Sequence, residues 1–283
     1  MTIEMGPNRY GKARVRLVKV VRLPDRHVVR DLTVRVALEG DFADAHVTGD
    51  NSQVIATDTM KNTVYALAKD GLTGSIEAFG TLLADHFLLH RQVHRSTIWL
   101  QEHAWDPIVV DGSRAPDAFL RNGSLTRTAT VTAEASGMTI EAGVEDLSVM
   151  KTTKSAFAGF PRDRYTTLAD TDDRIMATKV TATWRYGTGA SYLDRDAAFE
   201  RVLATFMRVF AEHFSPSVQN SIWVVGKAVL EAELSIDEIS FALPNLHHWL
   251  ADLRPFGLDN DREIFVATTE PHGLIEATVR RSG

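Results

Sequence analysis

Cysteine is absent from the 283-residue chain, long apolar runs do not occur in it, and basic residues are fewer than acidic ones. Without thiols the chain cannot form disulfides, thiolate zinc sites or iron–sulfur clusters, and it has no cysteine nucleophile. No window of about 20 apolar residues occurs, so we expect no membrane-spanning helix. The 31 basic residues are outnumbered by 37 acidic ones, and the net charge of −6 argues against a dedicated nucleic-acid-binding protein.

The N-terminal segment shows no basic stretch followed by an apolar one. We therefore expect no signal peptide, and a cytoplasmic location is the default expectation. The chain is about twice as long as the ~150 residues of one typical domain. Its 44% of apolar residues is enough to build a substantial core, so we expect two globular domains.

Hydrophobic periodicity predicts the same order of elements in each half of the chain: two strands, two helices, two strands. In the first half we expect strands Ala13–Val21 and Leu32–Leu38, a helix that begins after Thr57-Asp58, a helix from Ser75 to about Arg91 with Ser75 as N-cap, and strands Ser96–His103 and Ala118–Ala133, the last with a hairpin signal at Asn122-Gly123. In the second half we expect strands Met138–Met150 and Lys179–Tyr186, helices from about Arg195 to Phe214 and from Ser217 to about Glu233, and strands Glu238–Leu243, Glu263–Thr268 and Gly273–Arg280. This order favours an α+β fold in which antiparallel sheets carry helices on one face.

Five short segments hold the specific information. They are Tyr10–Lys12, Asn51–Tyr65, Phe157–Asp163, Tyr165–Leu168 continuing to Asp173–Ile175, and Leu243–His248. In this order they resemble the urate oxidase (uricase) family, and the resemblance extends from about Tyr10 to Arg280. It implies a tandem T-fold of two antiparallel four-stranded sheets, each with two helices on one face, in domains 9–136 and 137–283. It also implies a tunnel-forming homotetramer.

The resemblance implies a pocket for urate, a flat purine anion with hydrogen-bonding atoms on every edge. Phe157 would stack on the purine face, and Arg174 would grip one edge with a two-pronged contact that a lysine could not reproduce. Val218 and the Gln219 amide would hold the opposite edge. From the residues alone, simpler interpretations remain: a core phenylalanine, a surface arginine among acidic residues, and a solvent-facing glutamine at a helix start.

Thr57 and Asp58, at the start of a helix, form a natural capping pair. The free backbone N–H groups of a helix N-terminus also suit an anion, so the structural and functional interpretations are compatible. In the family this turn faces the five-membered ring of urate.

By resemblance, Lys12, Thr57 and His247 form a catalytic proton relay. Lys12 would act as the base through the Thr57 hydroxyl, and the Asn245 amide would hold dioxygen or water above the ring beside Thr57. A structural histidine is the simpler interpretation of His247. A metal at His247-His248 is discounted, because adjacent strand residues point to opposite sides and no carboxylate follows at ligand spacing.

The implied reaction uses no metal and no cofactor. Urate is oxidised by dioxygen to 5-hydroxyisourate and hydrogen peroxide, a step of purine degradation. Each active site would be shared, with Lys12 and Thr57 of one subunit facing the other site residues of a neighbour. Ala158, Leu246 and Ile222-Trp223 depart from the family pattern, but none of these departures removes a predicted catalytic group.

Three alternatives remain open at this point. A non-catalytic purine-binding T-fold protein would keep the pocket without turnover, although the presence of Lys12, Thr57 and His247 argues against it. A T-fold hydrolase of the pterin or cyclohydrolase kind would generally need a metal. A structural assembly module would need only the sheets and helices.

Overall fold

Each half of the chain forms four main antiparallel strands and two long helices, as the periodicity predicts. The structure is a computed structural model and describes residues 2–121, 123, 125–187 and 193–282. The chain divides into two units, Met1–Gly143 with Ala190–Asp196 and Val144–Gly189 with Ala197–Gly283. The division falls within strand β7 (Gly137–Lys151), so the domain boundary between residues 136 and 137 stays a prediction.

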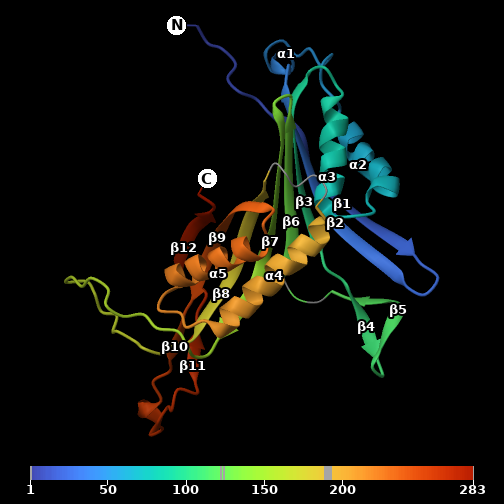
Figure 1. Cartoon of the computed structure of the whole chain (residues 1–283). Coiled ribbons are helices and arrows are strands. Elements are labelled where there is room, and N and C mark those ends of the chain that lie inside the picture. Colours follow the sequence, from blue (N-terminus) through green and yellow to red (C-terminus); the bar gives the residue numbers. More distant parts are fainter. Residues whose placement is uncertain (1, 122, 124, 188–192, 283) are drawn as a thin grey trace. The chain divides into compact units, whose positions relative to one another are not determined.

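The first unit is built on four antiparallel strands in the order β1-β2-β3-β6. Helix α2 packs on β1, and α3 packs on β3 and β6 (Figure 1). The elements in chain order are β1 (Tyr10–Arg22), β2 (His27–Gly40), α1 (Ala43–Val47), α2 (Thr57–Gly71), α3 (Ile76–Leu88), β3 (Val93–His103), β4 (Asp106–Val110), β5 (Ser113–Leu120) and β6 (Thr126–Glu134).

The core of this unit follows from the two periodicities of its sequence. Every second residue of β2 points to the sheet face that the helices cover. Residues three or four positions apart on α2 and α3 pack against these side chains. The fully buried members include Leu32, Val34, Leu38, Met60, Val64, Phe79 and Leu83. Ser75 caps α3, since its Oγ accepts a hydrogen bond from the Ala78 N–H at 3.2 Å, which confirms the predicted N-cap.

The second unit repeats the plan with strands in the order β7-β8-β9-β12 and helices α4 and α5 on one face (Figure 1). Trp184, Phe206 and Phe241 lie in its core. Besides β7, its elements are β8 (Met176–Tyr186), α4 (Arg195–Glu212), α5 (Val218–Ala232), β9 (Ile236–Leu246), β10 (His248–Leu250), a short 3-10 helix (Arg254–Phe256), β11 (Phe265–Ala267) and β12 (Gly273–Arg280).

A two-residue hairpin that was not predicted joins β4 and β5. Strand β5 pairs with β4 across Asp111-Gly112, where both residues have positive φ (51° and 78°), as a two-residue hairpin turn requires. Strand β4 was not expected at all. Of the predicted turn Asn122-Gly123, Asn122 lies outside the described residues.

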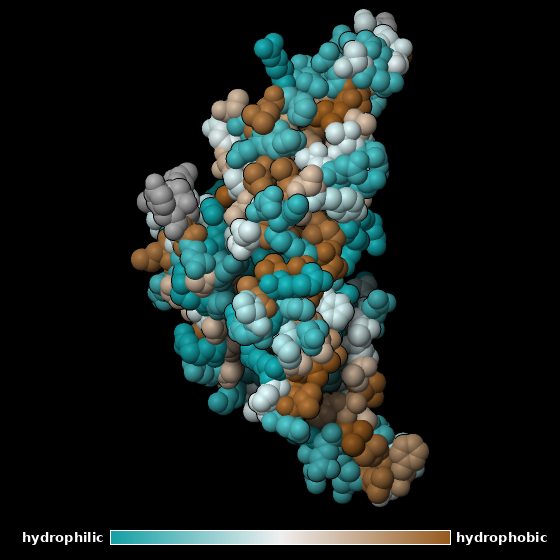
Figure 2. Space-filling model, turned by 90° about the vertical axis from the view of Figure 1, so that its right-hand side faces the viewer, coloured by the Kyte–Doolittle hydropathy of each residue, from teal (hydrophilic) through white to brown (hydrophobic). Residues whose placement is uncertain are grey.

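The predicted strand Glu263–Thr268 is shorter than expected. Only β11 forms there, and it pairs with the unpredicted β10 as a separate two-stranded ribbon. We call the segment from β10 to β11 the arm. Its apolar side chains Leu250, Phe256, Leu258 and Ile264 are at least half exposed, and hydrophobic atoms are visible at the lower end of the molecule in Figure 2. Within the described residues no helix is long and apolar enough to cross a membrane.

Candidate functional site

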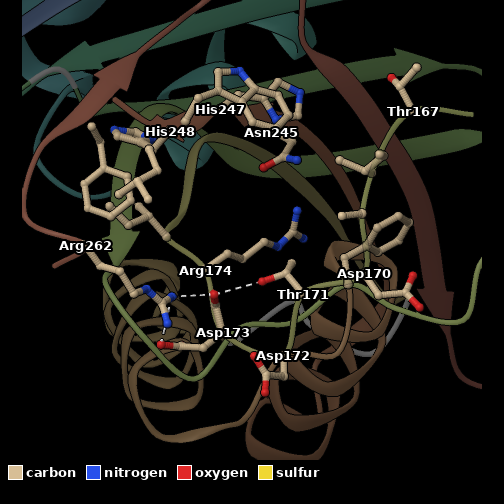
Figure 3. A pocket seen from close by; sticks show the side chains of 17 residues that line it. Thr167, Asp170, Thr171, Asp172, Asp173, Arg174, Asn245, His247, His248 and Arg262 are labelled. Carbon is tan, nitrogen blue, oxygen red and sulfur yellow. Dashed lines mark hydrogen bonds and ion pairs between the residues drawn. The ribbon is translucent and has the colours of Figure 1, made fainter. Parts of the chain in front are cut away.

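The second unit contains a cavity of about 790 Å³ that gathers four of the predicted site residues (Figure 3). Phe157 and Arg174 reach it from the segment between β7 and β8. Asn245 and His247 reach it from the end of β9. The other lining residues are Thr167–Asp173, Ile175, His248, Trp249, Leu250, Arg262 and Phe265.

Backbone hydrogen bonds set the spacing of Phe157 and Arg174. The Phe157 N–H donates to the Thr171 carbonyl at 2.8 Å, and the Thr171 N–H donates back at 3.0 Å. The Arg174 N–H donates to the Ser155 carbonyl at 2.7 Å. The two ends of the segment therefore run side by side, and residues 17 positions apart in the sequence become neighbours.

The Arg174 guanidinium is a half-buried cation above an aromatic ring. Its Cζ lies 5.4 Å from the Phe157 ring centroid, and its buried Nε has no hydrogen-bond partner in the part of the chain that the structure describes. Burial lowers the pKa of Arg174 from its usual value, because desolvation penalises the charged form. A cation held this way attracts a planar anion more strongly than a solvated one would.

Phe157 is only partly buried, so it is not a core residue. Its ring stacks on Phe160 with the centroids 4.9 Å apart and the planes 12° from parallel. The Arg162 guanidinium lies over Phe160 at 4.9 Å. Phe157 is thus supported from behind by a second ring, a geometry suited to a fixed stacking platform.

Asn245 and His247 are placed by the sheet and by the arm. Asn245 pairs with Thr178 of β8 and with Gly273 of β12. The His247 carbonyl accepts a hydrogen bond from the Thr268 N–H at 2.9 Å, and its ring stacks on Trp249 at 5.0 Å. Figure 3 shows the Arg174 guanidinium pointing toward the side chains of Asn245 and His247.

The electrostatics around His247 favour a neutral imidazole. Burial lowers the pKa of His247, and the nearby charges of Arg174, His272 and His248 lower it further. A neutral imidazole can accept a proton at one nitrogen while donating from the other, as a proton relay requires.

Val218 and Gln219 open α5, as predicted, but neither lines the cavity. The Ser217 side chain caps this helix by accepting from the Asn220 N–H at 3.1 Å. A parallel bridge joins Ser155 to Ser215. Residues shortly before α5 therefore lie beside residues shortly before Phe157. Contact of Val218 and Gln219 with a ligand stays a prediction.

Lys12, Thr57 and Asp58 belong to the first unit. Thr57 is the first residue of α2, and Ala56 is the N-cap without any side-chain cap, so the predicted Thr57-Asp58 capping pair is wrong. Asp58 instead pairs with Lys61 at 2.5 Å. This hydrogen bond and the Lys61 charge lower the pKa of Asp58, with a smaller contribution from the charge of Lys12.

The uncapped start of α2 leaves backbone N–H groups of the first turn without intrahelical partners. The Tyr10 hydroxyl holds the preceding loop by two hydrogen bonds with the Ile55 backbone. Burial raises the pKa of Tyr10 from its usual value, so the hydroxyl stays protonated and can donate. The first unit therefore carries Lys12 on β1 and the Thr57 hydroxyl at the positive end of α2.

The sequence model of the uricase family matches residues 8–132 and 140–276. A uricase of Arthrobacter globiformis is 47% identical over 282 residues, which cover 99% of this chain and 91% of the relative. A uricase of Dictyostelium discoideum is 38% identical over 279 residues, covering 97% and 96%. A crystal structure of the Arthrobacter globiformis uricase has a TM-score of 0.94 over 100% of this chain and 96% of that one. The chain belongs to the uricase family.

Membership of the uricase family confirms the predicted α+β tandem T-fold. The fold also matches a crystal structure of a Bacillus fastidious uricase, with a TM-score of 0.85 at 24% identity. The family resemblance stated from the five sequence segments is confirmed as well.

The family motifs did not reveal the part that the arm plays in the cavity. Trp249, Leu250 and Arg262 line it, although none of them lies in a motif segment. The alternation in Phe265–Ala267 was a signal for an extended segment, but nothing in the sequence indicated that Arg262 would return to Asp173. Among the described residues no three His, Asp or Glu side chains are grouped so as to hold a metal ion.

Proposed function

We propose that the chain catalyses the oxidation of urate by dioxygen to 5-hydroxyisourate and hydrogen peroxide. The reaction balances as urate plus dioxygen plus water giving the two products. Support comes from the uricase relatives and from one observation in this structure, the half-buried Arg174 guanidinium over Phe157, whose Nε has no hydrogen-bond partner among the described residues. Urate is anionic, flat and rich in hydrogen-bonding edges, so it matches this platform.

Substrate binding would use both polar and apolar contacts of the cavity. Phe157 would stack on the purine, and Arg174 would donate two hydrogen bonds to one edge. Gln219, with the Val218 backbone, would meet the opposite edge. The cavity volume of about 790 Å³ exceeds what one purine needs, which leaves room for dioxygen and water.

Chemistry would begin with loss of a further proton from bound urate, through the Thr57 hydroxyl to Lys12. The urate dianion then transfers an electron to dioxygen held by Asn245, and the two radicals combine at C5. The resulting hydroperoxide eliminates hydrogen peroxide, and water adds to give 5-hydroxyisourate. A neutral His247 would pass protons to the peroxide, consistent with the lowered pKa of this residue.

The two groups of site residues would meet between subunits of a homotetramer. Lys12, Thr57 and Asp58 of one subunit would face Phe157 and Arg174 of a neighbour. The exposed apolar side chains of the arm favour burial against another protein surface. A cytoplasmic location remains the expectation from the sequence.

The deciding experiment measures urate loss, oxygen uptake and peroxide formation with the purified protein after exhaustive chelation. We expect equal amounts of the three. Urate binding without consumption would favour the non-catalytic alternative, and activity that is lost on chelation would favour a metal-dependent hydrolase or oxidase. A Thr57→Ala variant is the matched control, because it should bind urate but turn it over slowly.

A further inference from the structure

Three of the four residues before Arg174 are acidic, yet within the described residues none of them pairs with it. Asp170 pairs with Arg162 at 3.0 Å, and Asp173 pairs with Arg262 at 3.1 Å. Asp172 is exposed and points away from the Arg174 guanidinium (Figure 3). Within the described ranges, two of the three carboxylates are therefore already paired with other arginines, and the third is exposed.

Asp173 is the critical carboxylate, because it is the immediate neighbour of Arg174. Its Oδ1 accepts a hydrogen bond from the Thr153 hydroxyl at 2.9 Å, and its Oδ2 faces Arg262. Its backbone carbonyl accepts from Arg262 at 2.5 Å and from the Thr171 hydroxyl at 2.9 Å. Both the carboxylate and the carbonyl of Asp173 are thus engaged by other residues, and Figure 3 shows the contacts with Arg262 and Thr171.

Arg262 is held in place by the turn of the arm in which it lies. Its backbone has a positive φ of 64°, an uncommon conformation for this residue type. The Asn260 side chain closes the surrounding turn, since its amide donates to the Ala251 carbonyl at 2.9 Å and its oxygen accepts from the Glu263 N–H at 3.0 Å. A specific turn therefore fixes the guanidinium that reaches Asp173.

We propose that Arg262 is a positioning residue that keeps the Asp173 carboxylate from neutralising Arg174, so that Arg174 remains available to the purine anion. This inference rests on the proposed function. An unpaired carboxylate beside a half-buried guanidinium would form an ion pair with it, and substrate would then have to displace that carboxylate. Arg262 removes this competitor before substrate arrives.

The test is a double-mutant cycle read as KM and kcat for urate. In Arg262→Gln we expect KM to rise about tenfold, the size of one ordinary contact to a charged group, with kcat within about twofold of wild type. Adding Asp173→Asn to this variant should return KM to near the wild-type value, because the competing carboxylate is gone. A merely structural role of Arg262 predicts no such rescue.

Arg254→Gln is the matched control. Arg254 lies in the same arm and pairs with Asp252 at 2.8 Å, but it does not line the cavity, so its removal should leave KM unchanged. Calorimetric titration with xanthine, a purine anion, gives affinity without turnover and should follow the same pattern as KM.

An unchanged KM in Arg262→Gln, or a double variant as impaired as the single one, overturns the inference. If Arg262→Gln does not assemble, Asp173→Asn alone decides: KM must stay level or fall, and a rise contradicts us. These outcomes concern Arg262 only. A wild-type protein that consumes no urate would instead refute the proposed function.

Discussion

The Tyr10 hydroxyl accepts a hydrogen bond from the Ile55 N–H at 2.8 Å and donates one to the Ile55 carbonyl at 3.2 Å. Two segments 45 residues apart in the sequence are thereby joined by a single side chain. Because Ile55 lies two residues before Thr57, this tie determines where the start of α2 lies relative to β1. The position of Thr57 therefore depends on Tyr10, which is not one of the predicted substrate-binding residues.

Tyr10→Phe should lower the free energy of unfolding by about 1–3 kcal/mol, because it leaves the Ile55 N–H and carbonyl without their partner. Urate turnover should fall more than urate binding, since Phe157 and Arg174 are untouched. Denaturant unfolding and steady-state kinetics measure the two effects. Wild-type stability in this variant would mean that water replaces the hydroxyl fully.

Glycine is the only residue type that fits at position 11, between Tyr10 and Lys12. A Cβ there would lie 1.9 Å from the Val36 carbonyl oxygen and 2.8 Å from the Ala37 Cα, both backbone atoms that cannot move away easily. Gly11→Ala should therefore destabilise the protein by more than about 2 kcal/mol. Gly74→Ala is the control, because an added methyl group there meets nothing within 4 Å. Equal melting temperatures for the two variants would contradict this account.

The sequence predicted the main elements because their signals are local. Alternation in β2 and the helical spacing of Phe79 and Leu83 are read within one segment, and each is reinforced by burial in the same core. The family motifs also identified Phe157, Arg174, Asn245 and His247, which the structure brings to one cavity. The resemblance to the family assigned these residues, since each of Phe157, Arg174 and His247 has a simpler interpretation when read alone.

The features that were missed depend on contacts between distant segments. The pairing of Arg262 with Asp173 joins residues 89 positions apart and leaves no periodic signal. Thr57 was expected to cap a helix because threonine often does so, but Ala56 takes that position and Thr57 becomes the first helical residue. A capping preference indicates that a helix begins nearby, but it does not fix the residue at which the helix begins.

Arg174→Lys should raise KM for urate by about ten- to a hundredfold, since a lysine cannot donate two parallel hydrogen bonds to one purine edge. The charge is kept, so long-range attraction of the anion should change little. Steady-state kinetics at two salt concentrations would separate these contributions. A KM close to the wild-type value would show that charge alone suffices and that the fork of Arg174 is not used.

Protonation of His247 should become easier when Arg174 is removed. Burial is the larger cause of its lowered pKa and stays in place, so Arg174→Gln should raise the His247 pKa only part of the way to the ordinary value of 6.5. Since the unfolded chain binds this proton more tightly, the neutral imidazole stabilises the fold above about pH 6.5. That contribution is lost as the pH falls through the lower folded pKa.

NMR of histidine labelled at Cε1 measures this shift directly. His86 of the first unit is an internal control, because its pKa is lowered by burial and by His90 and should not respond to Arg174→Gln. A His247 pKa that does not move in the variant would contradict the electrostatic coupling to Arg174.

The sharing of active sites between subunits can be tested by mixing two inactive proteins. Thr57→Ala removes a residue of the first unit, and Arg174→Gln removes one of the second, so each variant alone should be nearly inactive. After joint unfolding and refolding, a shared site takes Thr57 from one chain and Arg174 from another. Random assembly then restores both residues in about a quarter of the sites, and activity should recover to about that fraction of wild type. Sites formed within single chains would show no recovery, because every chain carries one of the two defects.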